Sequence, residues 1–400
     1  MSEMFEQMSL WGEMYPYFKI KQPVILLEMF AGIGAQRKAL EILGVKIDEE
    51  KSKICEWAYN SYIGYNAIHI KDKTDYSLGK SKEELIAKVL GTSINYNEPL
   101  SIEQLNKKPI EWLRSAYNNI VATHNLVNVM EVKGQDLGEL PKEQTSILTY
   151  SFPCQDLSLA GKRQGMATSQ ADGGTRSGLL WEIERILKER EKEDSTLPTI
   201  LLMENVPEVV GQGNIEHFKK WEERLRQFGY SNYVEILNGK NYGIPQNRRR
   251  CFMVSILGEY AYDFPCKVPL KYKLKDLLEK NVEDKYYLDD ETIERISNWN
   301  SQQKPLDNAI DPRNQERVSP TLTARGAGEE HGGMVLVKEN SIPIKNATSK
   351  GYIEAENGDG VDISTRMHYH RGTVQKGSSQ TLTTQGGDNI GVVINEQDSN

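Results

Sequence analysis

A cysteine, a carboxylate and a group of arginines stand at the ends of three apolar runs in this sequence. The runs cover residues 146–150, 199–203 and 251–254, and the polar residues beside them are Cys154, Glu204, Asn205 and Arg248–Arg250. Because ligands bind at strand ends in open α/β sheets, we expect these groups to lie close together. A thiol, a carboxylate and guanidinium groups can jointly act on one polar ring. Taken alone, Cys154 is either a nucleophile or an inert core cysteine.

Strands that alternate with helices organise the first 257 residues. Strands are predicted at 24–27, 52–55, 146–151, 199–203 and 251–256, and helices from the glycines at 32–34 through Leu43 and near 58–68, 179–192 and 214–228. This order predicts an α/β fold with a mostly parallel, doubly wound sheet. Residues 71–130 are polar, with helix-like patches near 81–90 and 109–122. We interpret them as a solvated insertion packed on the edge of the domain, with a partner-binding role as the alternative.

The segment Phe30-Ala31-Gly32-Ile33-Gly34 connects the first predicted strand to a helix. Two glycines at this spacing allow a tight turn and a close approach of the backbone to a ligand, although a purely structural turn fits as well. Lys38 occupies the place of the third glycine of a dinucleotide motif, and the acidic Glu28 would repel a phosphate and suit a cationic amino-acid head.

A carboxylate and aromatic rings complete this candidate cofactor site. Glu56 ends the second predicted strand about twenty residues after the glycines, where a carboxylate commonly binds ribose hydroxyls. Trp57 and Phe30 could cover the two faces of an adenine, and Asp136 could accept a hydrogen bond from its exocyclic amine. Aromatic faces and a ribose carboxylate without a phosphate cradle indicate an adenosyl nucleoside, of which S-adenosylmethionine is the common one.

Composition narrows the class of protein. The net charge of −8 argues weakly against wide nonspecific binding to nucleic acid but is compatible with a local basic groove. The four cysteines (55, 154, 251 and 266) form no C-x-x-C pair, so neither a metal site nor a disulfide framework is indicated. Cys55, Cys251 and Cys266 are interpreted as structural. No apolar stretch is long enough for a membrane span, and residues 1–22 form an acidic leader without secretory features, so a cytoplasmic protein is predicted.

Residues 258–400 differ from the preceding 23–257 and are predicted to form a smaller β-rich and loop-rich domain. Two segments within them, 319–337 and 379–394, share a Thr-Leu-Thr sequence followed by glycines and an apolar run. Each is predicted to form a strand, a glycine-rich loop and a second strand. Such a domain suits recognition better than chemistry.

The order of the motifs resembles that of the cytosine-C5 DNA methyltransferases of bacteria and phages. The motifs are F-A-G-I-G, E-W, D-L, P-C-Q, R-S-G-L, E-N-V and Q-N-R-R-R, and they extend over about residues 24–256. The resemblance implies a Rossmann-like domain that binds S-adenosylmethionine and a C-terminal target recognition domain. By the same resemblance, the cofactor-binding residues are Phe30, Ala31, Gly32, Gly34, Glu56, Trp57, Asp136, Leu137, Pro153 and Leu179.

The resemblance also implies a role for each catalytic residue. Cys154 would add to C6 of a cytosine, while Glu204 would hydrogen-bond N3 and Asn205 would help to hold Glu204 and the ring. Arg250 would reach the cytosine O2, and Arg248 would steady the site. The target base would be flipped out of double-stranded DNA. Expected DNA contacts are Gln155, Lys162, Arg163, Arg249, Arg325 and Gln385.

The sequence departs from this family in two places. The late segments R-x-L-T-P-R-E and G-N-S-x-x-x-P are not found, and Glu28 stands where an Asp is usual. Either the C-terminal end is truncated or a second polypeptide completes it, and a cognate restriction endonuclease is a further expected partner. Two alternatives remain: a methyltransferase that acts on RNA, and a non-catalytic fragment that binds cofactor or DNA.

Overall fold

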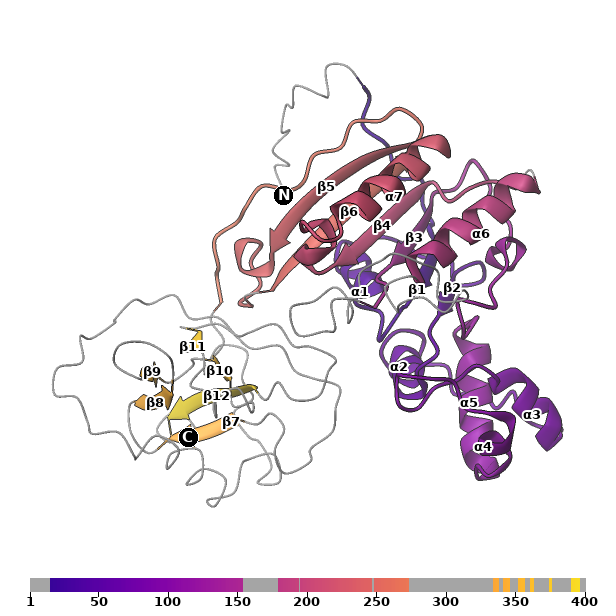
Figure 1. The fold of residues 1–400 in the computed structure, drawn as a ribbon. Coiled ribbons are helices and arrows are strands. Elements are labelled where there is room, and N and C mark those ends of the chain that lie inside the picture. Colours follow the sequence, from indigo (N-terminus) through magenta and orange to yellow (C-terminus); the bar gives the residue numbers. More distant parts are fainter. Residues whose placement is uncertain are drawn as a thin grey trace. The chain divides into compact units, whose positions relative to one another are not determined.

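The fold is taken from a computed structural model of the chain (Figure 1). The structure describes residues 15–153, 179–193, 195–246 and 248–272, and the short strands 334–337, 341–345, 352–356, 360–362, 374–375 and 390–395. Six predicted site residues lie outside these ranges: Cys154, Gln155, Lys162, Arg163, Arg325 and Gln385. The chain divides into two compact units, Met1–Glu235 with Cys251–Phe264 and Ile236–Arg250 with Pro265–Asn400. The domain boundary at 257 remains a prediction.

A six-stranded sheet in the order β2-β1-β3-β4-β6-β5 organises the first unit. Its strands are β1 (Ile25–Met29), β2 (Lys53–Cys55), β3 (Ser146–Tyr150), β4 (Ile200–Asn205), β5 (Tyr230–Asn238) and β6 (Arg249–Leu257). β1 pairs in parallel with β2 and β3, and β3 with β4, whereas β6 runs antiparallel to β4. The predicted mostly parallel α/β sheet is therefore confirmed.

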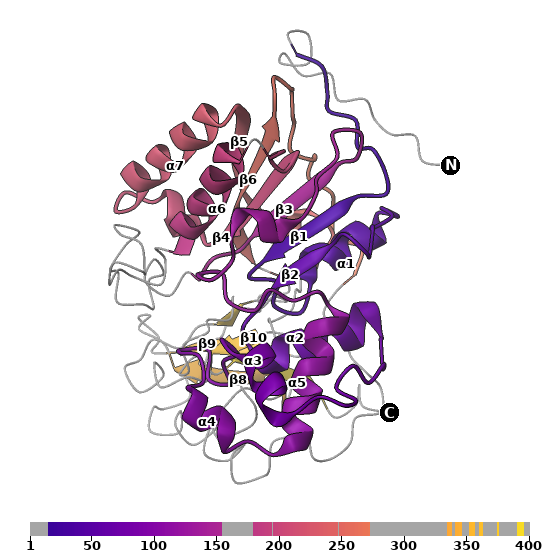
Figure 2. The same ribbon diagram turned by 90° about the vertical axis from the view of Figure 1, so that its right-hand side faces the viewer.

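Helices cover both faces of this sheet, as expected for a doubly wound fold. α6 (Leu180–Lys192) and α7 (Ile215–Gln227) lie on one face and α1 (Ala35–Ile42) on the other (Figures 1 and 2). Successive side chains of β1 lie on opposite faces of the sheet. Leu27 belongs to the core under α6 and α7, while Leu26 packs with Leu40 of α1. Both faces are buried, so β1 and β3 are buried along their whole length and consist mainly of apolar residues.

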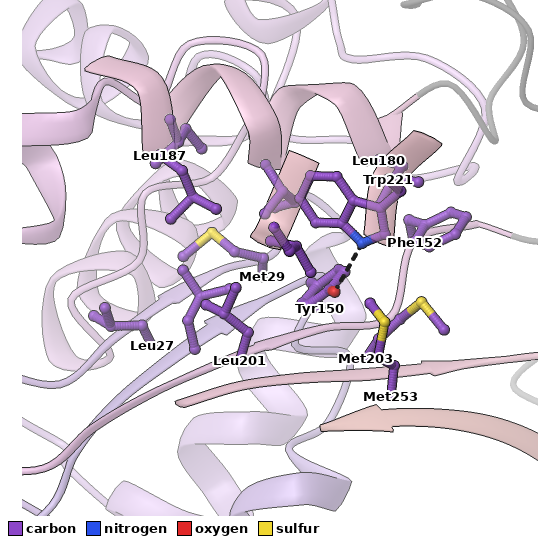
Figure 3. Packing of buried hydrophobic residues seen from close by; sticks show 14 of the residues in the cluster. Leu27, Met29, Tyr150, Phe152, Leu180, Leu187, Leu201, Met203, Trp221 and Met253 are labelled. Atoms are coloured by element: carbon purple, nitrogen blue, oxygen red, sulfur yellow. Dashed lines mark hydrogen bonds between the residues drawn. The ribbon is translucent and has the colours of Figure 1, made fainter. Parts of the chain in front are cut away.

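The larger core lies between the sheet and the helices α6 and α7 (Figure 3). The side chain of Trp221 is fully buried there, and its Nε1 donates a hydrogen bond of 3.1 Å to the hydroxyl of Tyr150. A buried indole N–H needs such a partner, because its desolvation would otherwise be uncompensated. Tyr150 is the last residue of β3, so this contact fixes the strand end from which the chain continues toward Cys154.

The insertion forms a helical group with a core of its own. It contains α3 (Lys82–Val89), α4 (Ile102–Asn106) and α5 (Ile110–Ala122), and it follows α2 (Tyr59–Tyr65) and a π-helical turn η1 (Asn66–Ile70). Leu85, Leu105 and Leu113 are fully buried and cluster with Tyr62 and Tyr65 of α2. The two predicted helices are confirmed, and α4 was not predicted. The insertion is thus packed on α2 through apolar side chains, not merely solvated.

The strand β5 was also not predicted. It lies at the edge of the sheet, and the exposed fractions of Val234 and Ile236 are 36% and 38%. An edge strand buries only part of its surface, so its sequence, Tyr-Ser-Asn-Tyr-Val-Glu-Ile-Leu-Asn, lacks the apolar run that identifies the central strands. Among the described residues, no helix combines the length and hydropathy that crossing a membrane requires.

The second unit contains short strands in two sheets. The strands are β7 (Met334–Val337), β8 (Ser341–Lys345), β9 (Tyr352–Glu356), β10 (Gly360–Asp362), β11 (Val374–Gln375) and β12 (Ile390–Asn395). One sheet has the strand order β11-β10-β12-β7, and the other consists of β8 paired with β9. β7 and β12 are the second strands of the two predicted repeats, and they pair in parallel with Val393 opposite Val335. The first strands of the repeats lie outside the described residues.

Candidate active site

The carboxyl ends of β1, β2, β3 and β4 lie at one edge of the sheet. Met29 pairs with both Cys55 and Tyr150, and Tyr150 pairs with Met203, so the strands end nearly level with one another. The glycine segment follows β1, Glu56 and Trp57 follow β2, and the segment leading to Cys154 follows β3, while Asn205 is the last residue of β4. The structure therefore brings the predicted cofactor residues and the predicted catalytic residues of β4 to the same edge.

The glycine segment contains three residues in the left-handed region of backbone conformation. Phe30, Gly32 and Gly34 have φ values of 60°, 56° and 81°. Gly34 precedes α1, and a Cβ at this position would lie 2.5 Å from Nε2 of His69 and 2.7 Å from Cε2 of Tyr65. The chain must therefore carry glycine at 34 both for its backbone angle and for the space around it.

Replacing Gly34 by alanine is expected to lower the free energy of unfolding by roughly 2–4 kcal/mol, since the left-handed conformation and the clash both add a cost. Gly32→Ala is the matched control: Gly32 also has a positive φ of 56°, but a Cβ there would meet nothing within 4 Å. The control should lose only about 1–2 kcal/mol. Urea unfolding followed by tryptophan fluorescence measures both variants. Equal losses would show that the contact with His69 and Tyr65 costs nothing.

Glu56 connects the glycine segment to the end of β2. Its Oε2 accepts a hydrogen bond of 2.8 Å from the backbone N–H of Gly32, and its Oε1 accepts one of 2.8 Å from Ala58. The side-chain amide of Asn125 accepts a hydrogen bond from the backbone N–H of Glu56 and donates another to the carbonyl oxygen of Glu56. Burial raises the pKa of Glu56 above its ordinary value, and these N–H groups partly offset the shift. Asn125 was not identified from the sequence.

The two predicted aromatic covers pack against different hydrophobic clusters. Phe30 and Trp57 are both half-buried, and they pack against separate hydrophobic clusters, Phe30 against the larger core and Trp57 against the core of the insertion. Their remaining surfaces are accessible. Leu137 and Leu179 belong to the larger core, with exposed fractions of 1% and 7%.

The carboxylate of Asp136 caps a local turn. Asp136 lies in a short 3₁₀ helix η2 (Gly134–Leu137), and its Oδ2 accepts a hydrogen bond of 2.8 Å from the backbone N–H of Lys133. Its backbone carbonyl accepts a hydrogen bond from the ammonium group of Lys53 at 2.6 Å. The side chain is half-buried, and its predicted contact with an exocyclic amine remains a prediction.

Asn205 anchors the segment that leads to Cys154. Its Nδ2 donates a hydrogen bond of 3.0 Å to the carbonyl of Phe152, and its Oδ1 accepts one of 2.8 Å from the N–H of Val206. Gln36 of α1 adds a second anchor, because its Nε2 donates to Oγ of Ser151 at 2.8 Å. The described segment ends with Pro153. Gln36 and Ser151 were missed in the sequence, where nothing distinguishes them from other polar residues.

Glu204 and the arginines lie on β4 and at the beginning of β6. Glu204 is half-buried and pairs with Phe252, and Asn205 pairs with Cys251. Arg249 and Arg250 are the first residues of β6; Arg249 is exposed, whereas Arg250 is 7% exposed and donates to the carbonyl of Arg249. This alternation places the side chain of Arg249 in solvent, where a phosphate contact is feasible.

Two of the described cysteines are unreactive. Burial raises the pKa of the Cys251 thiol to about 12, with Glu204 adding a smaller effect, and burial also raises the pKa of Cys55. Both thiols therefore stay protonated near neutral pH, as expected of structural cysteines. Cys266, in contrast, is exposed, and its structural role remains a prediction. Among the described residues, no cluster of His, Cys, Asp or Glu could hold a metal ion.

Glu28 does not face a ligand as the sequence suggested. Its carboxylate is fully buried, Oε2 accepts a hydrogen bond from the hydroxyl of Tyr65, and Oε1 accepts one of 3.3 Å from the backbone N–H of Arg37. Burial raises its pKa from the ordinary 4.5 to about 7, although both hydrogen bonds and the charge of Arg37 oppose the shift. The expectation of a cationic amino-acid head on Glu28 is corrected: the carboxylate is used inside the protein.

The raised pKa of Glu28 predicts a pH-dependent stability. Between pH 4.5 and about 7 the folded chain binds more protons at this site than the unfolded chain, so stability falls as pH rises through this window. Relative to Glu28→Gln, which is neutral throughout, the wild type should lose roughly 3 kcal/mol across the window. Unfolding of both proteins in urea at a series of pH values measures the difference. Parallel stability curves would contradict the assignment.

The chain is similar to proteins of a known family. A family profile described as C-5 cytosine-specific DNA methylase matches residues 100–385. The orphan methyltransferase M.SssI of Spiroplasma monobiae (strain ATCC 33825 / MQ-1) is 36% identical over 335 residues, 79% of this chain and 82% of that protein. The type II methyltransferase M2.ScrFI of Lactococcus lactis subsp. cremoris is 35% identical over 266 residues, 66% of this chain and 69% of that protein. A solved Dnmt2 methyltransferase of S. pombe, at 16% identity, covers 68% of this chain and 65% of its own with a TM-score of 0.42, a likeness too slight to carry an argument.

Proposed function

The chain belongs to the C-5 cytosine-specific DNA methylase family and is a DNA cytosine methyltransferase, and on this premise we propose the chemistry of its site. We propose that it transfers a methyl group from S-adenosylmethionine to C5 of a cytosine flipped out of double-stranded DNA, through a covalent bond between Cys154 and C6. The observation that carries the proposal is the shared sheet edge, where the glycine segment and Glu56 stand beside the anchored segment that ends at Pro153.

The residue types suit an attack on a pyrimidine. C5 of cytosine is a poor nucleophile, and addition of the Cys154 thiolate to C6 breaks the aromatic system and makes C5 enamine-like. Glu204 shares a proton with N3 and so favours the addition. Asn205 fixes the segment that precedes Cys154 by its hydrogen bond to the carbonyl oxygen of Phe152. Arg250 is assigned to the cytosine O2 and Arg248 to steadying the site. C5 would then take the methyl group that the sulfonium supplies, and the bond between that methyl carbon and sulfur would break to leave a thioether. Removal of the C5 proton by a base and elimination would then free the thiol.

The described residues fit an adenosyl cofactor. A carboxylate has about four acceptor positions, so Glu56 can accept a ribose hydroxyl in addition to the backbone N–H groups of Gly32, Ala58 and Trp57. The half-buried rings of Phe30 and Trp57 are available for an adenine, and a Cβ at Gly32 would meet open space. S-adenosylmethionine, when bound, supplies the sulfonium methyl group. Further contacts are assigned to Ala31, Gly34, Asp136, Leu137, Pro153 and Leu179.

DNA is the proposed partner. Arg249, which is exposed, is assigned to a phosphate, and Gln155, Lys162 and Arg163 to the strand around the flipped base. Arg325 and Gln385 of the second domain are assigned to base edges in the major groove. A second polypeptide, a restriction endonuclease and a cytoplasmic location remain predictions from the sequence.

Transfer of a labelled methyl group from S-adenosylmethionine tests the proposal. Purified protein is incubated with double-stranded DNA or with RNA of the same sequence, and the modified base is identified after digestion. The expected product is 5-methylcytosine in DNA, at a rate far above that with RNA. Preferential labelling of RNA would favour the RNA alternative, and labelling of another base would reject the C5 chemistry. Bisulfite sequencing of DNA from cells expressing the chain then identifies the recognition sequence.

A further inference from the structure

A group of polar side chains behind the glycine segment takes no part in the proposed chemistry. The ring of His69 is its centre: the side chain is 1% exposed, Nε2 lies 3.0 Å from the carbonyl oxygen of Ile33, and Nδ1 lies 3.2 Å from Oε1 of Glu41. His69 comes from the π-helical turn η1, Ile33 from the glycine segment and Glu41 from α1. The ring therefore connects the insertion side of the domain to the candidate cofactor turn.

The ring also sets the space available to the glycine segment. A Cβ at Gly34 would lie within 2.8 Å of two atoms of the His69 ring, and the ring of Tyr65 packs beside it with centroids 4.9 Å apart. The turn consequently rests directly on the imidazole. A change of side chain at 69 alters both the hydrogen bond to Ile33 and this packing, so an experiment must separate the two.

Both neighbours of the imidazole are hydrogen-bond acceptors. A carbonyl oxygen cannot donate a hydrogen bond, so Nε2 is the donor in the contact with Ile33. Glu41 is itself held in place by Arg37 at 3.0 Å and Lys38 at 3.4 Å, and these partners lower its pKa against the opposing effect of burial. The position of the Glu41 carboxylate is thus fixed, and the imidazole ring of His69 is held between this carboxylate and the carbonyl oxygen of Ile33.

The turn needs such support because its backbone is not part of the sheet. Three of its residues are left-handed, and its N–H groups are tied to Cys55 and Glu56 on the β2 side. Ile33 is tied on the opposite side, through its carbonyl to His69. A loop that must present its backbone to a ligand binds more tightly when its bound shape is already fixed.

We propose that His69 is a positioning residue for the cofactor: by donating to the Ile33 carbonyl it holds Phe30–Gly34 in the shape that binds the adenosyl group. The inference rests on the proposed use of S-adenosylmethionine and goes beyond it, because His69 touches neither cofactor nor DNA in the proposed chemistry. Loss of the hydrogen bond should weaken cofactor binding and leave the chemical step at saturating cofactor unchanged.

Two variants of similar size separate hydrogen bonding from packing. Gln at 69 can donate to Ile33 from the same position as Nε2, whereas Leu fills the space without a donor. In His69→Leu we expect the Kd for S-adenosylmethionine, measured by calorimetry, to rise about tenfold, and in His69→Gln to stay within about threefold of wild type. In both, kcat at saturating cofactor and DNA should stay within about twofold. His124→Leu is the control, since His124 contacts the carbonyl of Ser52 at 3.2 Å, before β2 begins.

Equal Kd values for His69→Gln and His69→Leu would overturn the proposal, and so would a loss of kcat without a change in Kd. A rise in Kd for His124→Leu as large as for His69→Leu would also overturn it, since the effect would then be general. Thermal melts show whether each variant is folded. If His69→Leu is unfolded, the test rests on His69→Gln, and a rise in the Kd of that variant above about threefold overturns the proposal. Failure of the proposed function looks different, because the wild type itself would then bind no S-adenosylmethionine.

Discussion

Replacing Cys154 by alanine should lower methyl transfer to DNA by about 10⁴-fold or more, because without the thiolate C5 of cytosine stays an aromatic carbon of low nucleophilicity. Binding of S-adenosylmethionine should be unchanged, since the glycine segment and Glu56 are built from β1 and β2. The rate is measured by transfer of a labelled methyl group in a single turnover, and cofactor binding by calorimetry.

Cys266→Ser provides the matched control. Cys266 is the exposed thiol among the described residues, so it tests whether loss of any accessible thiol slows the reaction. It should retain nearly full activity. Cys251 is a poorer control, because its side chain is fully buried and its replacement would disturb the core. Activity of Cys154→Ala comparable to wild type would exclude covalent catalysis through this residue.

Glu204→Gln should lower the rate of methyl transfer by about 10²-fold, and Glu204→Ala by about 10³-fold. A glutamine amide can still donate a hydrogen bond to N3 of the cytosine, but it cannot share a proton with it, so addition of the thiolate becomes harder. Alanine removes the hydrogen bond as well. The Kd for S-adenosylmethionine should change little in either variant, and single-turnover rates at saturating cofactor measure the effect.

Glu208→Gln is the control for this substitution. Glu208 is also half-buried and lies only four residues beyond Glu204, in the short 3₁₀ helix Pro207–Val210. The change alters the charge of the same region without touching the end of β4, and the rate should stay close to that of wild type. A similar loss of rate in both variants would indicate a general effect of charge and would remove Glu204 from the proposed mechanism.

The central strands could be predicted from the sequence because parallel strands covered on both faces are apolar runs with clear ends. The runs at 24–27 and 146–151 correspond closely to β1 and β3. The edge strand β5 could not be predicted, because Val234 and Ile236 remain exposed and its polar residues break the pattern. The strands β7 and β12 could be predicted because the two repeats have similar sequences, whereas their parallel pairing was not predicted.

The candidate site was only partly predictable for a related reason. Phe30 and Glu56 stand directly after strands and Asn205 is the last residue of one, and the strand order alone brings strand ends together. Asn125 and His69 are far from these positions in sequence, and their roles depend on how the helices α2 to α5 pack against the sheet. Glu28 shows the converse limit: an acidic residue at a strand end looked accessible, but its side chain points into the protein.

Covalent capture on DNA that contains 5-fluorocytosine tests the bond between Cys154 and cytosine most directly. After addition of the thiolate and transfer of the methyl group, fluorine at C5 cannot leave as a proton does, so the protein stays attached to the DNA. We expect a complex that survives denaturing electrophoresis, forms only with S-adenosylmethionine present, and yields the peptide containing Cys154 as the attachment site. A protein that methylates ordinary DNA but forms no such complex, or forms it through another residue, would contradict the proposed mechanism.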